Sequence, residues 1–239
     1  MNDLRRSSQT LDAYERLRAL LLGGRLAAGS RLAEEKWSAE LGAHRGAIRE
    51  AMRLLAHDGL LKSGAKGGFF VPEVDVASLD EVIEVRLSME LGAIQLLELS
   101  GRVSPRGIDR LDQVSGMMEM LCDEGFTAGF SEADHRFHEV LVGMAENSRL
   151  ATIYRHAPLP NSPFPEVDRQ ESTRMMRETI DEHRAITRRL EEREFREAAS
   201  ILKSHLLRCH SGMFRAGPAD PCSRTDAVTP VSGAPPAEH

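Results

Sequence analysis

The stretch HRGAIREAMRLLAHDGLLKSGAKGGFFV, from His44 to Val71, carries the pattern that decides the fold of the N-terminal part of the chain. Its first half repeats apolar residues at helical spacing and stops at an Asp-Gly pair, which predicts a helix. Its second half places two short apolar runs, 59–62 and 68–71, on either side of a turn of Gly, Lys and Ser. Two such runs around a glycine-rich turn predict a β-hairpin directly after the helix.

The residues before this stretch add two more helices. Apolar residues recur at helical spacing over 10–24 and again near 33–41, and glycine ends each pattern. Three short helices followed by a hairpin form a winged helix-turn-helix. We therefore expect this domain over residues 1–72, followed by a short linker at 73–77.

Beyond the linker, the strand signals vanish. Helical periodicity returns in six consecutive segments, which predict an all-helical antiparallel bundle over residues 78–214. The final residues, 215–239, are rich in Pro, Ala, Gly and Ser and are expected to be disordered. The expected fold class is mostly α, a winged helix-turn-helix followed by a helical bundle. The six helices are expected at 78–100, 105–123, 127–145, 148–156, 168–192 and 194–214.

Charge also separates the two parts. The whole chain has a net charge of −6, which alone argues against binding to nucleic acid. Residues 1–72, however, carry 12 Lys and Arg against 8 Asp and Glu, a net +4, whereas the rest carries 19 against 29, a net −10. A basic head joined to an acidic bundle indicates two domains with different partners.

The cysteines and the apolar runs indicate the cellular compartment in which the protein is expected. Cys122, Cys209 and Cys222 are odd in number and form no C-x-x-C spacing, so we expect neither a disulfide framework nor a cysteine zinc site. The N-terminal segment has no apolar region typical of a secretory signal, and no apolar run approaches the roughly 18 residues of a membrane span. We expect a cytoplasmic protein without a membrane partner.

The helix that begins near His44 is the candidate DNA-reading helix, because the second helix of a helix-turn-helix enters the major groove. Arg45 and Arg49 lie one turn apart, opposite its apolar face, and Lys66 lies among glycines at the tip of the hairpin. Arginine can hydrogen-bond to guanine and to phosphate. The alternative is that these arginines only form the solvent-exposed face of a helix, as most surface arginines do. The residues expected at DNA are His44, Arg45, Gly46, Arg49, Lys66 and Gly67.

The segment from Arg31 to Val71 resembles the winged-helix domain of GntR-type transcriptional regulators. The family pattern Ser/Thr-Arg-Thr-Pro-Val-Arg-Glu-Ala-Leu is matched here at both arginines, the glutamate and the apolar positions, but not at Ser/Thr, Thr and Pro. Members of the family often carry another arginine on the preceding helix, and Lys36 is the residue that fits this role here. The departures predict an operator that differs from the family's usual one.

A second pattern lies in the bundle. Asp134 and His138 are four residues apart, so they share one helix face. His183 and His205 lie ten and eleven residues from the connection at 193–194, so an antiparallel hairpin brings them side by side. Three imidazoles and one carboxylate suit a divalent transition ion such as Zn, Ni, Fe or Mn, whereas a lone histidine on a helix usually binds none. His135, His156 and His210 fall off this register and are interpreted as surface or packing residues.

The bundle is similar to the FCD effector domain of the FadR-like branch of GntR regulators. The resemblance is carried by Asp134-His135-Arg136-Phe137-His138, by the pair Glu182-His183 and by His205, and it covers roughly residues 10–214. It implies a metal-binding member at Asp134, His138, His183 and His205, with a small carboxylate effector near the metal. Arg86 and Glu90 match an Arg-x-x-x-Glu of the family, and Arg86 is a plausible carboxylate clamp. An ordinary ion pair between Arg86 and Glu90 is the alternative.

These observations predict a homodimeric, ligand-responsive DNA-binding regulator acting on a pseudo-palindromic operator, with repression favoured over activation. Two alternatives stay open. One is a metal-dependent hydrolase-like enzyme, for which Glu182 or Glu139 would have to supply a base. The other is a regulator whose metal is purely structural.

Overall fold

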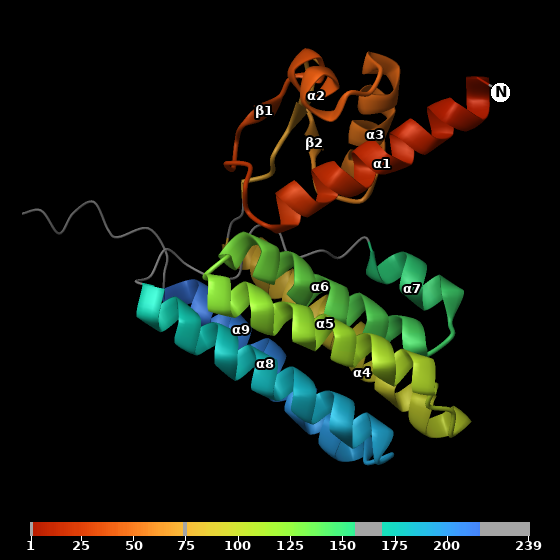
Figure 1. Ribbon diagram of the computed structural model, residues 1–239, viewed down its shortest axis with the longest axis vertical. Helices are drawn as coiled ribbons and strands as arrows, with labels where there is room; N and C mark the ends of the chain where they lie inside the picture. The colour runs from red at the N-terminus through yellow and green to blue at the C-terminus, as the bar shows by residue number, and fades with distance from the viewer. Residues whose placement is uncertain (1, 74–75, 156–168, 216–239) are drawn as a thin grey trace, which may run out of the picture.

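The computed structural model describes residues 2–73, 76–155 and 169–215. The predictions for the tail at 215–239 and for His156 therefore concern residues outside, or almost wholly outside, the described part. The chain folds into a small winged head above a larger helical bundle (Figure 1). Among the described residues, no helix is long and apolar enough to cross a membrane.

The head contains the three predicted helices and a three-stranded sheet. The helices are α1 (Asn2–Leu22), α2 (Glu34–Leu41) and α3 (Arg45–His57), and the strands are β1 (Arg31–Leu32), β2 (Lys62–Ser63) and β3 (Phe69–Phe70). The strand order is β1-β3-β2, and both pairings are antiparallel. The predicted hairpin is confirmed as β2 and β3, and β1 is an addition that the sequence did not suggest.

The first helix differs from its expected bounds of 10–24. It begins at Asn2 because residues 2–10, which are mostly polar, contain no Gly or Pro that would break a helix. The apolar periodicity, in contrast, begins only at Leu11. Periodicity marks the part of a helix that packs with an apolar stripe, so turns without such a stripe escape it.

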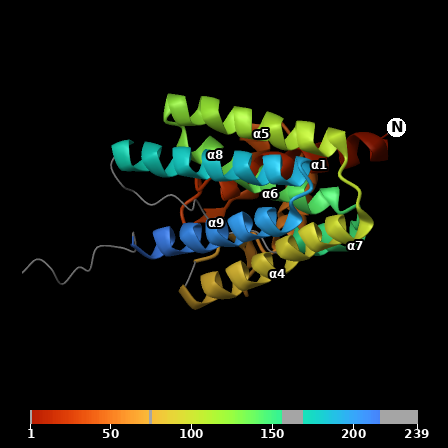
Figure 2. The same cartoon turned by 90° about the horizontal axis from the view of Figure 1, so that it is seen from below.

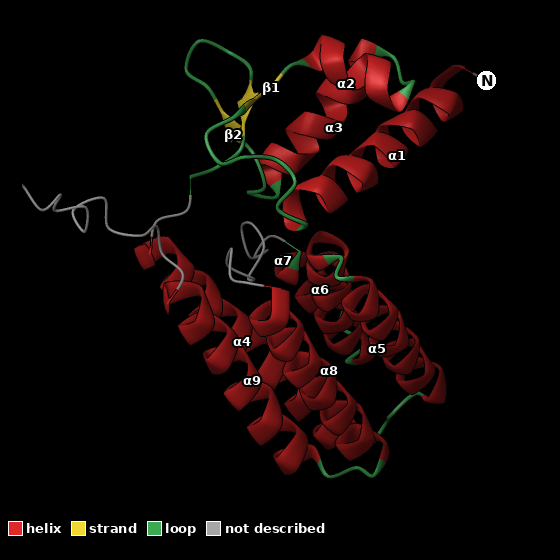
Figure 3. Cartoon of the chain, turned by 60° about the vertical axis from the view of Figure 1, so that its left-hand side comes forward, coloured by secondary structure: helices red, strands yellow, loops and turns green. Residues whose placement is uncertain are grey.

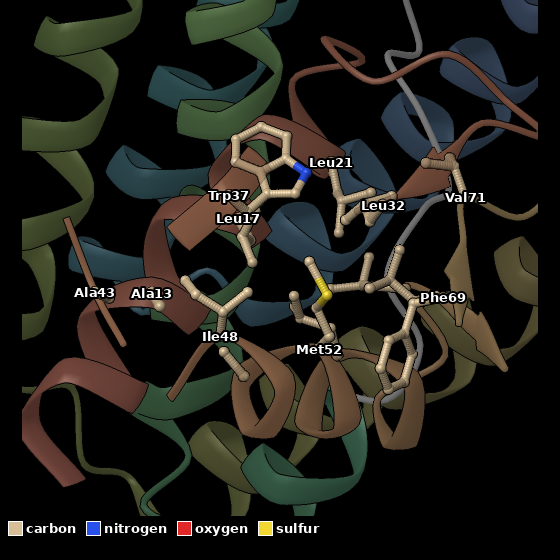
Figure 4. Packing of buried hydrophobic residues seen from close by; sticks show 14 of the residues in the cluster. Ala13, Leu17, Leu21, Leu32, Trp37, Ala43, Ile48, Met52, Phe69 and Val71 are labelled. Atoms are coloured by element: carbon tan, nitrogen blue, oxygen red, sulfur yellow. The ribbon is translucent and has the colours of Figure 1, made fainter. Parts of the chain in front are cut away.

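The core of the head is apolar. Leu17 from α1, Ile48, Met52 and Leu55 from α3, and Trp37 from α2 are buried together over the sheet (Figure 4). Apolar burial contributes about 25 cal/mol per Å² removed from water, so this cluster suffices to hold three short helices together.

The bundle contains six helices, each within two residues of its predicted bounds. Figure 3 shows them packed below the head, and Figure 2 shows the same helices side by side from below. They are α4 (Val76–Ser100), α5 (Pro105–Glu124), α6 (Thr127–Met144), α7 (Ser148–Tyr154), α8 (Arg169–Glu191) and α9 (Phe195–Arg215).

Helix α6 lies at the centre of the molecule. It contacts α4, α5, α7 and α8 of the bundle and also α1 of the head. Eleven of its 18 residues are buried, so it has no broad solvent face. At its N-terminal end it approaches the end of α1 closely, because a Cβ at Gly23 would lie 2.9 Å from the carbonyl oxygen of Ala128. Any polar group on α6 is thus removed from water and needs a partner inside the protein.

Candidate metal centre

Helix α6 supplies two of the predicted ligands. Asp134 and His138 are 5% and 0% exposed, and they lie one turn apart on the same helix. His135, between them, is also buried but lies outside the cluster of ligating atoms, as the register predicts. A buried carboxylate and imidazole on one face indicate a specific polar site, because burial of each costs free energy unless it is compensated.

The hairpin of α8 and α9 supplies the other two ligands. A tight connection around Arg193, whose φ is 61°, turns the chain back on itself. The prediction that His183 and His205 lie side by side is confirmed, because their Nε2 atoms are 3.3 Å apart. Phe137 of α6 stacks on the His183 ring with centroids 3.8 Å apart, which fixes the plane of that imidazole.

The four side chains converge on one point. The Nε2 atoms of His138 and His205 are 3.2 Å apart, and Asp134 Oδ1 lies 3.5 Å from His183 Nε2 and 4.0 Å from His138 Nε2. Candidate ligand atoms of all four residues lie within 4.8 Å of one another. Buried Asp134 Oδ1 accepts no hydrogen bond from the described residues. An orphaned carboxylate oxygen facing three imidazole nitrogens fits a bound cation.

Two outer carboxylates orient the rings. Glu90 Oε2 lies 2.6 Å from His138 Nδ1, and Glu182 Oε2 lies 2.7 Å from His205 Nδ1. A carboxylate accepts a hydrogen bond from Nδ1–H, so it selects the tautomer whose Nε2 carries a lone pair. Each carboxylate is also held by an arginine, Glu90 by Arg86 and Glu182 by Arg208.

Electrostatics favour a positive charge at the point of convergence. Burial lowers the pKa of His138 and holds the pKa of His183 well below its ordinary value, so both rings are neutral at pH 7. Burial also acts to lower the pKa of His205, but Cys209, Glu182 and Asp134 outweigh it and raise that pKa to about 10. The centre can hold a proton on His205 or a metal ion in its place. Only a metal ion engages both neutral rings and Asp134 at once.

The predicted effector residues form an internal network. Arg86 Nε donates to Glu90 Oε1 over 2.9 Å, so the alternative of an Arg–Glu ion pair is what the structure contains. Tyr154 joins it, since its hydroxyl donates to Glu90 over 2.7 Å and accepts from Arg86 over 3.1 Å. Buried Arg86 Nη2, in contrast, has no partner among the described residues. Tyr154 was missed because α7 reaches the site only through the tertiary fold.

The predicted DNA-contacting residues lie on the outer surface of the head. His44 occupies the N-cap position of α3 without a side-chain capping hydrogen bond, and Arg45 and Arg49 are exposed after it. Both arginines pair with the preceding helix: Arg45 with Glu35, and Arg49 with Glu34 at 2.6 Å. The remaining predicted contacts are also exposed, and they are Lys36, Gly46, Lys66 and Gly67.

Family models match both parts of the chain. The model described as FCD domain matches residues 81–208, and that described as bacterial regulatory proteins, gntR family, matches residues 9–71. The first alone spans more than half of the chain. This chain therefore belongs to the GntR family of bacterial regulators and carries an FCD domain.

Individual relatives agree with this assignment. The HTH-type transcriptional regulator YdhC of Bacillus subtilis is 29% identical over 155 residues, which are 61% of this chain and 65% of that protein. The gluconate operon transcriptional repressor of Bacillus licheniformis is 27% identical over 154 residues, 64% of this chain and 62% of that protein. The chain thus spans slightly less than two thirds of the length of these relatives.

The fold also matches a solved structure. E. coli McbR/YncC superposes with a TM-score of 0.75 at 19% identity, over 87% of this chain and 97% of that chain. The family and these relatives are transcriptional regulators, not enzymes, which decides against the hydrolase alternative. Glu182 and Glu139, the carboxylates considered as bases, are held by Arg208 and Arg18 respectively.

Proposed function

We propose that this chain is a DNA-binding transcriptional regulator, most simply a repressor of the FadR-like branch, whose bundle binds a divalent metal ion and a small carboxylate. The observation that carries the proposal is the four-residue cluster joined to a GntR head in one chain. The gluconate operon repressors among the relatives support repression as the expected mode. A regulator of this kind acts on DNA in the cytoplasm.

The head supplies DNA binding. Exposed Arg45 and Arg49 on α3 can reach base edges and phosphates in the major groove, and Lys66 on the wing can reach the backbone. To do so, the arginines must release or share Glu35 and Glu34. These ion pairs are exposed, so exchanging them for phosphate costs little. Two heads in a homodimer would read a pseudo-palindromic operator.

The bundle supplies a metal site. Glu90 and Glu182 hold the Nδ1 atoms of His138 and His205, so the Nε2 atoms of these two rings face each other. A cation bound between them would displace the proton that His205 otherwise holds. The residues that would hold the ion are Asp134, His138, His183 and His205. Nitrogen and oxygen donors in this ratio suit Zn, Ni, Fe or Mn. The bound ion would supply a Lewis-acidic anchor for an anionic effector.

Arg86 is the candidate carboxylate clamp. Its unpartnered Nη2 lies on the buried network that runs through Glu90 to His138. A guanidinium binds a carboxylate through two parallel hydrogen bonds, and Arg86 has an unpartnered Nη2, among the described residues, beside the Nε that bonds Glu90 and Tyr154. An effector carboxylate would add a partner to Arg86 and change the packing of Tyr154 and α7.

Helix α6 connects the metal site to the head. His138 faces the metal ligands, and the next residue, Glu139, pairs with Arg18 of α1. The guanidinium of Arg25 lies 4.5 Å from the ring centroid of Phe126, just before α6. Because α1 packs against α3, a shift of α6 changes how α3 is presented to DNA. Regulatory couplings of this kind amount to about 1–3 kcal/mol.

A structural ion is the second candidate role for the metal. It is favoured by the burial of all four ligands, none more than 5% exposed. In that case the ion would stabilise the bundle without answering an effector.

The test is a melting scan of chelator-stripped full-length protein with Zn²⁺, Ni²⁺ or Mn²⁺, followed by gluconate, citrate and lactate. A ligand at 100 times its dissociation constant adds about 2.7 kcal/mol, which shifts the melting temperature by several degrees. A metal shift plus a further shift from one acid supports the sensor. A metal shift without any acid response supports the structural ion, and no metal shift refutes the metal proposal.

A further inference from the structure

Cys209 lies beside the metal centre. It follows His205 by one turn of α9, and its Sγ is 4.0 Å from both ring nitrogens of His205. The side chain is a free thiol of intermediate exposure. Residues four apart share one helix face, so α9 presents His205 and Cys209 in the same direction.

The surroundings of this thiol point independently to a cation. Asp134 is about 95% buried, and its Oδ1 has no hydrogen-bond partner among the described residues. That oxygen is directed at His183 Nε2 from 3.5 Å, within the cluster that can hold an ion. Cys209 therefore borders a built polar site.

The charges around this site leave room for a second anion. Glu90 is neutralised by Arg86, and Glu182 is neutralised by Arg208. Asp134 is then the one ligating carboxylate without its own arginine, so a divalent ion held by Asp134 and three neutral imidazoles keeps one net positive charge. A buried uncompensated charge is costly, and a thiolate ligand would cancel it.

The distances allow the thiol to coordinate. In a five-coordinate ion, sulfur and nitrogen ligands at neighbouring positions lie up to about 3.8 Å apart, given bond lengths near 2.3 and 2.1 Å and angles of about 90–120°. The observed 4.0 Å between Cys209 Sγ and His205 Nε2 is close to this value. Because Sγ is equally far from both ring nitrogens, it lies beside the ring. Sγ is not among the ligand atoms that lie within 4.8 Å of one another, so coordination requires it to move. A change between staggered χ1 rotamers moves a cysteine sulfur by about 3 Å, which is a displacement of the size needed.

We propose that the Cys209 thiolate is an additional ligand of the metal and selects borderline ions such as Zn²⁺ or Co²⁺ over Mn²⁺. The inference rests on the proposed metal site. On binding, the S–H bond breaks, its proton leaves to the solvent, and a sulfur–metal bond forms without any change of oxidation state. Thiolate is a soft ligand, so it favours zinc and cobalt over the harder manganese ion.

The test uses Co²⁺ as the probe, added to chelator-stripped full-length protein under reducing, anaerobic conditions. Visible d–d bands report that Co²⁺ has bound, and a near-ultraviolet sulfur-to-cobalt charge-transfer band reports a thiolate ligand. Cys209→Ser removes the thiol, and Cys122→Ala is the matched control, because Cys122 is buried in a different core cluster.

We expect both signals in the wild type and in the Cys122→Ala variant. Cys209→Ser should keep the d–d bands, lose the charge-transfer band, and lose about 10- to 100-fold in affinity for Zn²⁺ relative to Mn²⁺. Wild-type d–d bands without a charge-transfer band would overturn the role of Cys209 and leave the metal site standing. A charge-transfer band that survives Cys209→Ser would also overturn it. Absence of d–d bands would refute the metal site itself.

Discussion

The interiors of the head and of the bundle are built on opposite principles. The head buries Leu17, Ile48, Met52 and Leu55 in an apolar cluster and keeps its predicted DNA-contacting charges outside. The bundle has apolar clusters as well, but between them it buries charged or ionisable groups. They include Arg86, Glu90, Asp134, His135, His138, His183 and His205.

The difference indicates which of the two domains can respond to a bound ion. The core of the head consists of apolar side chains, so its stability should not depend on a bound ion. A buried polar cluster is stable only while each member has its partner, so it responds to loss or gain of an ion. We therefore expect the stability of the bundle, more than that of the head, to depend on a bound ion, and four substitutions test this contrast.

The largest effect is expected from the core of the head. Leu55→Ala removes a fully buried side chain and should lower the free energy of unfolding of the head by about 2–5 kcal/mol, while metal affinity stays unchanged. Urea denaturation and metal titration measure the two quantities. Leu54→Ala is the matched control, because Leu54 is 37% exposed on the same helix. A loss of metal affinity in Leu55→Ala would show that the two interiors are not independent.

Removal of two predicted metal ligands should abolish the stabilisation of the bundle by a bound metal ion. In His183→Ala with His205→Ala, the increase of about 2.7 kcal/mol expected from Zn²⁺ at 100 times the wild-type dissociation constant should disappear. Mass spectrometry under native conditions counts the bound ion. His135→Ala is the control, since His135 is buried on α6 outside the cluster. Full metal retention in the double variant would remove both histidines from the site.

Loss of a groove arginine should weaken DNA binding and leave the bundle unchanged. Arg45→Ala and Arg49→Ala are each expected to cost about 1–3 kcal/mol with a duplex selected from a random pool. Fluorescence anisotropy at several salt concentrations measures this cost. Arg184→Ala, which removes an exposed arginine of α8, should bind DNA like the wild type. Equal affinities for all three variants would contradict the assigned groove contacts.

The smallest effect concerns the contact between the two regions. Arg18→Ala breaks the ion pair with Glu139, and it should reduce the difference in DNA affinity between metal-loaded and stripped protein by about 0.5–2 kcal/mol. Metal affinity itself should not change. Arg16→Ala is the matched control on α1, because the ion pair of Arg16 in the described part of the chain is with Asp12 of the same helix. If Arg18→Ala and Arg16→Ala behave alike, the coupling does not pass through Glu139.

The bundle was more predictable than the contacts inside it. Its helices appear within two residues of their expected bounds because each has an apolar stripe facing its neighbours. The convergence of Asp134, His138, His183 and His205 also follows from helical spacing and one tight turn. In the head, the first turns of α1 and strand β1 were missed, because the former carry no apolar pattern and the latter has only two residues.

The outer layer of the site was not predictable from spacing. Glu90 was expected at an effector, but it lies on His138, and Tyr154 was not considered at all. These partners come from three different helices, so only the packing of α4 and α7 on α6 brings them together. A carboxylate that orients a histidine leaves no sequence signature of its own.

The burial of the four ligands has a kinetic consequence. With His138 and His183 at 0% exposure, His205 at 1% and Asp134 at 5%, no ion can reach or leave the centre without a local opening of the bundle. Exchange is then limited by the rate of that opening, however tightly or weakly the ion is held at equilibrium. An ion captured while the bundle folds would remain for many rounds of DNA binding and release. On the time scale of a changing metabolite supply, the metal would be a permanent part of the protein. Only the carboxylate effector beside it would then respond to that supply.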